Sequence, residues 1–305
     1  MTAAEPAIRR PRRWGRVLTA MVTPFDGGGR LDLDAAQRLA GWLAQRGTDG
    51  LVVAATTGEA TVLSDAERRD LVRAVSEAVT IPVLAGTGTS DTAHTVALTR
   101  EAQALGAAGV LLVSPYYSRP PQAGIEAHFR AAAEATSLPV MIYDVPVRTG
   151  RRIARDVLLR LFRDVPNIVA FKDATGDPAA AAALVALAGE RFDLYSGDDA
   201  LTLPLLEVGS VGVVGTTTHW TGLEFAAMIA AFRAGRVEEA RAINAKLQDS
   251  FRFVDSDESV FPMSIKAMLR ALGHEAGDCR LPLPPAPADV RTQARGVWDR
   301  LRAGV

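Results

Sequence analysis

Eight short apolar runs, each followed by a segment with helical spacing, constrain the fold of this chain more than any other feature. Between the runs, Ala, Leu, Arg and Glu recur with the period of a helix, as in residues 33–44, 66–79, 93–105 and 125–135. Such alternation predicts parallel strands joined by crossover helices, and the continuously apolar runs predict strands buried on both faces. The runs occupy residues 17–22, 51–54, 81–85, 110–113, 140–143, 168–171, 193–195 and 211–214.

Eight strand-helix units predict an α/β fold, a closed (β/α)8 TIM barrel with a C-terminal helical appendage. An open doubly wound sheet is the alternative, but its first turn usually carries a glycine fingerprint, and here that turn reads Thr23-Pro24-Phe25. The later Gly86-Thr87-Gly88 is a weak phosphate-loop signal, because the P-loop lysine is missing. We expect a disordered basic tail over residues 1–14, a catalytic barrel over 15–235 and a helical region over 236–305, with helices at 237–253, 260–272 and 289–302.

Composition narrows the class of partner. The formal net charge of −1 leaves no excess of positive charge to hold nucleic acid or an anionic membrane. The arginines of residues 9–13 lie beside an apolar run too short for a signal peptide or a membrane span. A single cysteine, Cys279, excludes an internal disulfide, and the four histidines lack metal-ligand spacing. These features predict a cytoplasmic, metal-free protein that acts on a small molecule.

One lysine stands at the end of an apolar run. Only three of the 34 basic residues are lysines, namely Lys172, Lys246 and Lys266, and Lys172 directly follows the run 168–171. A guanidinium stays charged, whereas an amine can lose its proton when desolvated and then attack a carbonyl group. Lys172 is therefore a candidate Schiff-base nucleophile, and a solvated charge after a strand is the alternative.

The residues that follow the other runs point to the same chemistry. In TIM barrels the active site lies at the carboxyl ends of the strands. Hydroxyl groups gather there, and all four tyrosines are expected at this rim: Tyr116, Tyr117, Tyr143 and Tyr195. The rim lacks a glycosidase carboxylate pair and a Ser-His-Asp arrangement. An amine beside phenols and threonines fits the addition of an amine to a ketone, with a hydroxyl that moves the proton.

Six ordered motifs give the chain a family resemblance. Over residues 16 to about 275 it resembles the pyruvate-dependent class I aldolase family that contains dihydrodipicolinate synthase and N-acetylneuraminate lyase. The resemblance implies that no cofactor is needed beyond a covalent Schiff base, and that the chain forms a homotetramer of two tight dimers. The motifs are LTAMVTPF at 18–25, TTGE at 56–59, SPYY at 114–117, YDVPVRTG at 143–150, FKD at 171–173 and SGDD at 196–199.

The resemblance also implies catalytic roles. Lys172 is expected to form the Schiff base with pyruvate. Tyr143 is expected to relay protons through Thr56 to Tyr117, which the neighbouring subunit donates.

Binding roles follow from the same resemblance. Thr57 is expected to bind the pyruvate carboxylate, and Val214 and Gly197 are expected to contact the substrate through the backbone. Arg148 is expected to hold the carboxylate of a small aldehyde, L-aspartate 4-semialdehyde, and Tyr116 to pack across the subunit contact.

The implied reaction is the condensation of pyruvate with L-aspartate 4-semialdehyde to 4-hydroxy-tetrahydrodipicolinate, in lysine and diaminopimelate biosynthesis. Three departures concern the second substrate: Ala55 replaces a usual Gly, Asp144 replaces a usual Asn, and residues 215–220 replace a more apolar ending. A second hypothesis is a lyase for a sugar acid or another 2-keto acid, with Thr217, Thr218 and His219 as hydroxyl-binding residues. A third is a catalytically silent binding or regulatory protein.

Feedback inhibition by lysine is not expected to be strong. The resemblance implies an effector site near Tyr116, and His94 stands where the family has an acid that binds the effector. Ala60 also removes a hydroxyl from that site, and Asp65 and Asp91 are the carboxylates that could substitute.

Overall fold

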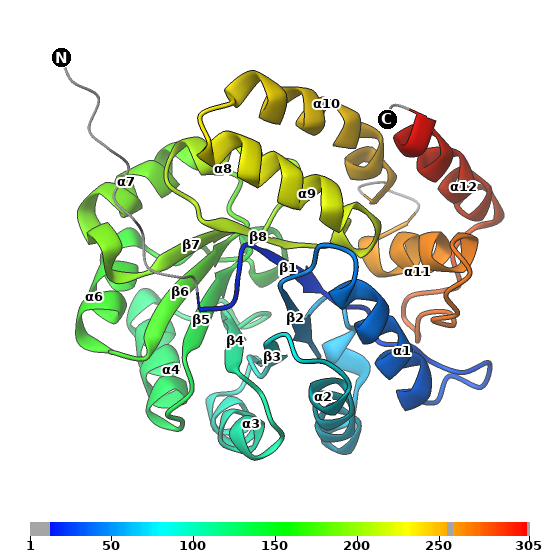
Figure 1. Cartoon of the computed structure of the whole chain (residues 1–305). Coiled ribbons are helices and arrows are strands. Elements are labelled where there is room, and N and C mark those ends of the chain that lie inside the picture. The colour runs from blue at the N-terminus through cyan, green and yellow to red at the C-terminus, as the bar shows by residue number, and fades with distance from the viewer. Residues whose placement is uncertain (1–12, 255–258, 304–305) are drawn as a thin grey trace.

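The computed structural model describes residues 13–254 and 259–303, and these form a closed barrel of eight parallel strands in chain order, with β8 paired back to β1 (Figure 1). The predicted TIM barrel is therefore confirmed. The strands are β1 (Val17–Ala20), β2 (Gly50–Val53), β3 (Val83–Gly86), β4 (Gly109–Val113), β5 (Val140–Asp144), β6 (Ile168–Asp173), β7 (Asp193–Ser196) and β8 (Gly212–Gly215).

Helices surround the barrel and continue beyond it (Figure 1). Those of the barrel are α1 (Leu33–Ala44), α2 (Asp65–Ala78), α3 (Thr92–Ala104), α4 (Gln122–Glu134), α5 (Pro146–Thr149), α6 (Arg155–Asp164), α7 (Pro178–Ala188), α8 (Thr202–Glu207) and α9 (Thr218–Arg233), with short 3-10 turns at Ala60–Val62 and Gly189–Arg191. After them come α10 (Val237–Val254), α11 (Phe261–Ala271) and α12 (Ala288–Ala303).

Local sequence explains where several helices begin. Asp32, Asp91 and Asp177 each accept a hydrogen bond from a backbone N–H in the first turn of the helix that follows. Ser64 and Glu67 form the capping box expected from the sequence, each bonding the backbone N–H of the other.

The barrel interior is filled by side chains rather than left open. Leu18, Met141, Tyr195 and Val214 belong to one buried apolar cluster, and a larger cluster lies between the strands and the surrounding helices. Trp14 is buried in the inner cluster, and its indole Nε1–H donates to the carbonyl of Ala108 at 3.2 Å. The tail expected over residues 1–14 thus extends too far, since Trp14 is part of the barrel, while residues 1–12 lie outside the described residues.

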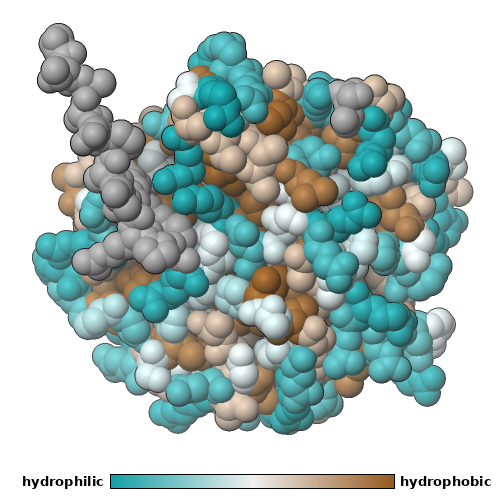
Figure 2. All heavy atoms as spheres, in the orientation of Figure 1, coloured by the Kyte–Doolittle hydropathy of each residue, from teal (hydrophilic) through white to brown (hydrophobic). Residues whose placement is uncertain are grey.

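The C-terminal helices pack on one side of the barrel (Figure 1). Helix α10 packs on α9, and α12 packs on both α10 and α11. In the described part of the chain, no helix is long and apolar enough to cross a membrane. On the face drawn in Figure 2, apolar residues form small patches between hydrophilic ones.

Candidate active site

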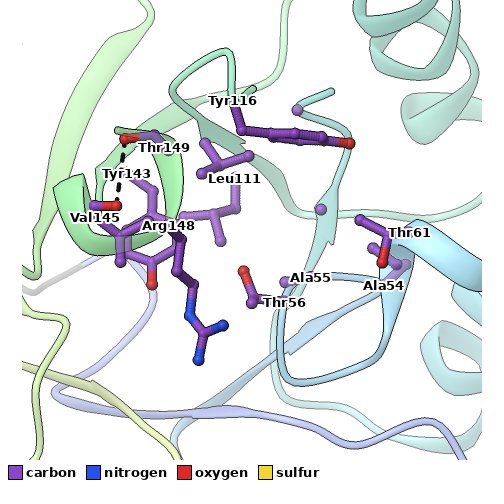
Figure 3. Close-up of a pocket in the computed structure, with 14 residues that line it drawn as sticks. Ala54, Ala55, Thr56, Thr61, Leu111, Tyr116, Tyr143, Val145, Arg148 and Thr149 are labelled. Carbon is purple, nitrogen blue, oxygen red and sulfur yellow. Dashed lines mark hydrogen bonds between the residues drawn. The ribbon is translucent and has the colours of Figure 1, made fainter. Parts of the chain in front are cut away.

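A cavity of about 230 Å³ opens at the carboxyl ends of strands β2 to β5. Figure 3 shows that the hydroxyl groups of Thr56 and Tyr143 and the guanidinium of Arg148 point toward the same space. The cavity combines these polar groups with an apolar wall, as small-molecule sites commonly do. Its lining residues are Ala54, Ala55, Thr56, Ala60, Thr61, Gly86, Gly88, Leu111, Val113, Tyr116, Tyr143, Val145, Arg148 and Thr149.

Lys172 does not line this cavity but contacts Tyr143, which does. Lys172 and Tyr143 are register partners on β6 and β5, and the Nζ atom lies 4.2 Å from the centre of the Tyr143 ring. The lysine is only 4% exposed, and burial lowers its pKa to about 8, an effect that nearby Asp199 opposes and Arg148 reinforces. A much larger fraction of this amine is therefore neutral near neutral pH than for an exposed lysine.

Tyr143 supplies a phenol that stays protonated. Burial raises the pKa of its hydroxyl well above the usual range, against the opposing effect of the Arg148 charge. A protonated hydroxyl close to an amine of lowered pKa can donate a proton to an oxygen that develops negative charge.

The segment after β2 carries both predicted threonines. Thr56 lines the cavity, and Thr57 beside it is buried. The turn is closed by a hydrogen bond from the Glu59 N–H to the Thr56 carbonyl at 3.1 Å. Strand β3 approaches this turn closely at Gly86, where a Cβ atom would lie 2.4 Å from the carbonyl oxygen of Ala54. Only glycine allows that approach.

Arg148 reaches the cavity mouth from the short helix α5. This helix ends at Gly150, whose left-handed φ of 73° closes the turn. The Arg148 guanidinium lies 4.4 Å from the centre of the Phe261 ring at the start of α11. Phe261 was not predicted as a site residue, because nothing in the sequence links it to a loop more than a hundred residues earlier.

Gly197 and Val214 lie at the ends of β7 and β8. A Cβ atom on Gly197 would lie 2.9 Å from the Cγ atom of Lys172, so only glycine leaves room for the Lys172 side chain. Val214 is fully buried in the inner cluster that also contains Tyr143. Gly197 therefore lies against Lys172, and Val214 shares the inner cluster with Tyr143.

Two adjacent tyrosines after β4 differ in environment. Tyr116 lines the cavity, whereas the side chain of Tyr117 is 94% exposed and its φ of 70° is left-handed. Tyr117 thus does not complete the cavity of its own chain. A non-glycine residue held in this conformation is uncommon and directs the ring outward.

The structure corrects the prediction that every tyrosine lies at the rim. Tyr195 is fully buried inside the barrel, and its hydroxyl donates to the carbonyl of Gly15 at 2.8 Å, before β1 begins. It is therefore a core tyrosine whose hydroxyl is satisfied by the backbone.

The residues after β8 are also buried rather than lining a ligand cavity. His219 accepts a hydrogen bond from the Val22 N–H at Nε2, and its Nδ1–H donates to the Thr216 carbonyl. Burial lowers the pKa of His219 to about 4, so the ring is neutral. Thr217 and Thr218 are fully buried as well. None of these three residues lines the cavity described above, and their binding of sugar-acid hydroxyls stays a prediction.

Asp144 and Asp173 come one residue after Tyr143 and Lys172 and face the opposite side of the barrel wall. They are register partners, and the Asp144 carboxylate accepts a hydrogen bond from the Ile153 N–H at 2.9 Å. Burial, opposed by the hydrogen bond from the Ile153 N–H and reinforced by the charge of Asp173, raises the pKa of Asp144 to about 7. Among the described residues, no group of three or more His, Cys, Asp or Glu side chains is placed to hold a metal.

A closed (β/α)8 barrel with a buried amine beside a phenol, at the carboxyl ends of its strands, defines a Schiff-base type of active site. The profile of the Dihydrodipicolinate synthetase family matches residues 13–299. The chain belongs to this family, and the family membership expected from the motifs is confirmed.

Relatives and solved structures agree with this assignment. The chain is 48% identical to the 4-hydroxy-tetrahydrodipicolinate synthase of Moorella thermoacetica, over 92% of this chain and 95% of the relative. It is 49% identical to the enzyme of the same name from Acidothermus cellulolyticus, over 94% and 92%. A crystal structure of the Cyanidioschyzon merolae enzyme with lysine bound superimposes with a TM-score of 0.93 at 41% identity, covering 96% of this chain and 99% of that one.

Proposed function

We propose that this chain is a Schiff-base-forming lyase that condenses pyruvate with L-aspartate 4-semialdehyde to 4-hydroxy-tetrahydrodipicolinate, in lysine and diaminopimelate biosynthesis. The observation that carries the proposal is the buried Lys172 amine, with a pKa lowered to about 8, beside the protonated Tyr143 phenol. Relatives of similar length that carry the synthase name support the substrate pair.

The proposed first half-reaction uses three side chains. The neutral Lys172 amine adds to the keto carbon of pyruvate, and loss of water from the carbinolamine leaves the Schiff base. Tyr143 donates the proton that the departing oxygen needs and recovers it through Thr56. The protonated Schiff base then withdraws electrons from the adjacent methyl carbon, which loses a proton to give the enamine that attacks the aldehyde, so this step needs no metal or other cofactor.

The other polar groups serve binding. Thr57 binds the pyruvate carboxylate, while the backbone of Val214 and Gly197 borders the amine. Arg148 then pairs with the carboxylate of the semialdehyde at the cavity mouth, where a guanidinium can engage both oxygens.

The assembly proposed for the protein is a homotetramer of two tight dimers. Its support is Tyr117, which is exposed on its own chain and free to enter the cavity of a neighbour to complete the proton relay, with Tyr116 at the same contact. The cytoplasmic location inferred from the sequence stays a prediction.

Borohydride trapping tests the proposal directly. Reduction in the presence of pyruvate should attach one pyruvate-derived group per chain, and peptide mapping should find it on Lys172. Lys246 and Lys266 serve as internal controls within the same digest. An adduct on either of these lysines, or no adduct, contradicts the mechanism. Turnover with pyruvate and a panel of small aldehydes then identifies the second substrate.

A further inference from the structure

Glu59 lies in the motif that supplies Thr56 and Thr57, but the reaction proposed above does not use it. Its side chain is buried, and its backbone adopts a left-handed φ of 54°. This conformation is unfavourable for a residue with a Cβ atom, so surrounding contacts have to maintain it.

The partner of Glu59 comes from the C-terminal region. The Nζ atom of Lys266, on α11, lies 2.7 Å from the Oε1 atom of Glu59, and both side chains are almost fully buried. The two atoms form a close ion pair without hydrogen-bond alignment, and among the described residues Oε1 accepts no hydrogen bond. The Oε2 atom accepts one from the Arg280 N–H at 2.9 Å.

Further contacts fix Lys266 in place. Its amine donates to the Asp278 carbonyl at 3.0 Å and lies 4.3 Å from the centre of the Phe25 ring, while the Arg280 guanidinium lies 4.2 Å from the same ring. The segment before Arg280 touches the loop after β1 directly, since the Phe25 N–H donates to the Ala276 carbonyl at 3.1 Å. The C-terminal region is thus joined to the loops after β1 and β2.

The ion pair is connected to the threonines through only a few backbone atoms. The Glu59 N–H donates to the Thr56 carbonyl, and the Gly58 carbonyl accepts a hydrogen bond from the Thr23 hydroxyl at 2.6 Å. A shift of Glu59 therefore moves the turn that carries Thr56 and Thr57. An isolated buried charge at this point would also draw water or rearrange the turn.

We infer that Glu59 and Lys266 are positioning residues: their buried ion pair holds the Thr56–Thr57 turn in the geometry that pyruvate requires. The inference rests on the proposed function and deepens it, because it makes α11 part of the support of the active site. It also explains why a chain so rich in arginine keeps a lysine at position 266, since the compact ammonium reaches Oε1 while packing over Phe25.

The test compares Glu59→Gln, Lys266→Met and the double variant. Each single change leaves one buried charge without its partner, so both should lower the melting temperature and the kcat/KM for pyruvate. The double variant leaves no lone charge, and its melting temperature should return toward that of the wild type. Its kcat/KM for pyruvate should remain roughly 10- to 100-fold reduced, the effect of a small misplacement of binding groups.

A matched control is Glu126→Gln, the same substitution at an ion-paired glutamate that shares no partner with Glu59. Glu126, on α4, pairs with Arg130 and Arg160, outside the turn of Thr56 and Thr57. This variant should lose stability, while its KM for pyruvate stays that of the wild type. A purely structural role for Glu59 would make the two Gln variants alike.

Hydrogen–deuterium exchange provides a measurement independent of turnover. The amides of residues 56–60 should exchange faster in the single and double variants, and those of the Glu126→Gln control should not. Unchanged exchange in this segment, or a double variant with wild-type kcat/KM for pyruvate, overturns the inference. If the wild type fails to trap pyruvate, the proposed function falls, but the exchange experiment still decides whether the ion pair holds the turn.

Discussion

The Nζ atom of Lys172 lies 4.2 Å from the centre of the Tyr143 ring, and the two residues are register partners on adjacent strands. The barrel itself brings the amine and the phenol together, so no loop has to close to form this pair. Because side chains alternate along a strand, the next register pair, Asp144 and Asp173, faces the surrounding helices instead. One strand pairing thus places an amine beside a phenol inside the barrel wall and two carboxyl groups outside it.

The lowered pKa of Lys172 predicts the pH dependence of Schiff-base formation. At a pKa of about 8, the neutral fraction of the amine increases steeply from pH 6, reaches about one half at pH 8 and levels off above about pH 9. The rate of pyruvate trapping should follow the same curve, measured at saturating borohydride over pH 6–9.5. A rate that still rises about tenfold per pH unit at pH 9.5 would indicate the ordinary lysine pKa of 10.5 and show that burial does not activate this amine.

Arg148→Ala should separate the two half-reactions. Trapping of pyruvate should remain nearly intact, while kcat/KM for L-aspartate 4-semialdehyde should fall. The fall should correspond to a loss of about 2–4 kcal/mol of transition-state stabilisation, the scale of a lost charge-assisted pair. Arg152→Ala is a suitable control, because Arg152 pairs with Asp177 and does not line the cavity. An equal loss for pyruvate would mean that Arg148 supports the structure rather than the second substrate.

Much of the fold followed from local patterns in the sequence. The apolar runs and helical spacings predicted all eight strands, and caps such as Asp32 and Ser64 marked helix starts, because these signals lie within a few residues of each other. The short helix α5, over Pro146–Thr149, was not predicted, since four residues carry no helical period.

Side-chain direction and long-range pairing could not be predicted in the same way. Tyr195 and Tyr143 both occur near strand ends, but one hydroxyl reaches Gly15 and the other lies in the cavity wall. The ion pair of Glu59 and Lys266 joins residues more than two hundred positions apart. A single sequence contains no local signal for such a contact.

Asp144→Asn should stabilise the protein in a pH-dependent way. The pKa of Asp144 is about 7 in the folded state against 3.8 ordinarily, so the folded state retains a proton that the unfolded state releases. Its contribution to stability is therefore lost as pH rises from about 4 to 7. The asparagine variant avoids this loss and should gain about 2–4 kcal/mol at pH 8, with little gain at pH 4.

Thermal unfolding at pH 4, 6 and 8 measures this effect. Asp156→Asn on α6 is the control, because that carboxylate is exposed and its pKa is lowered by Arg160. A gain for Asp144→Asn that is the same at every pH would show that the carboxylate is not protonated in the folded state.

The protein should be insensitive to feedback inhibition by L-lysine. His94 occupies the position where the family resemblance implies an acid for the effector, and an imidazole cannot form the charge-assisted pair that a carboxylate makes with the lysine ammonium. The absence of this charge-assisted pair should weaken the binding of L-lysine by about 1.5–3 kcal/mol. The two carboxylates that could substitute are already engaged: Asp65 lies 2.9 Å from His94 Nε2, and Asp91 caps α3.

Initial rates at saturating pyruvate against increasing L-lysine measure this sensitivity, and His94→Glu provides the matched gain-of-function variant. The wild type should keep most of its rate at lysine concentrations well above about 1 mM, where a competent site of ordinary affinity would be filled. The His94→Glu variant places a carboxylate where the imidazole stood, beside Asp65, and the pair should attract a cation. Half-inhibition appearing only in the variant supports the role assigned to His94, since the substitution adds only the charged acceptor that the wild type lacks. Half-inhibition of the wild type below about 1 mM would instead mean that Asp65 leaves His94 and itself binds the ammonium group of lysine.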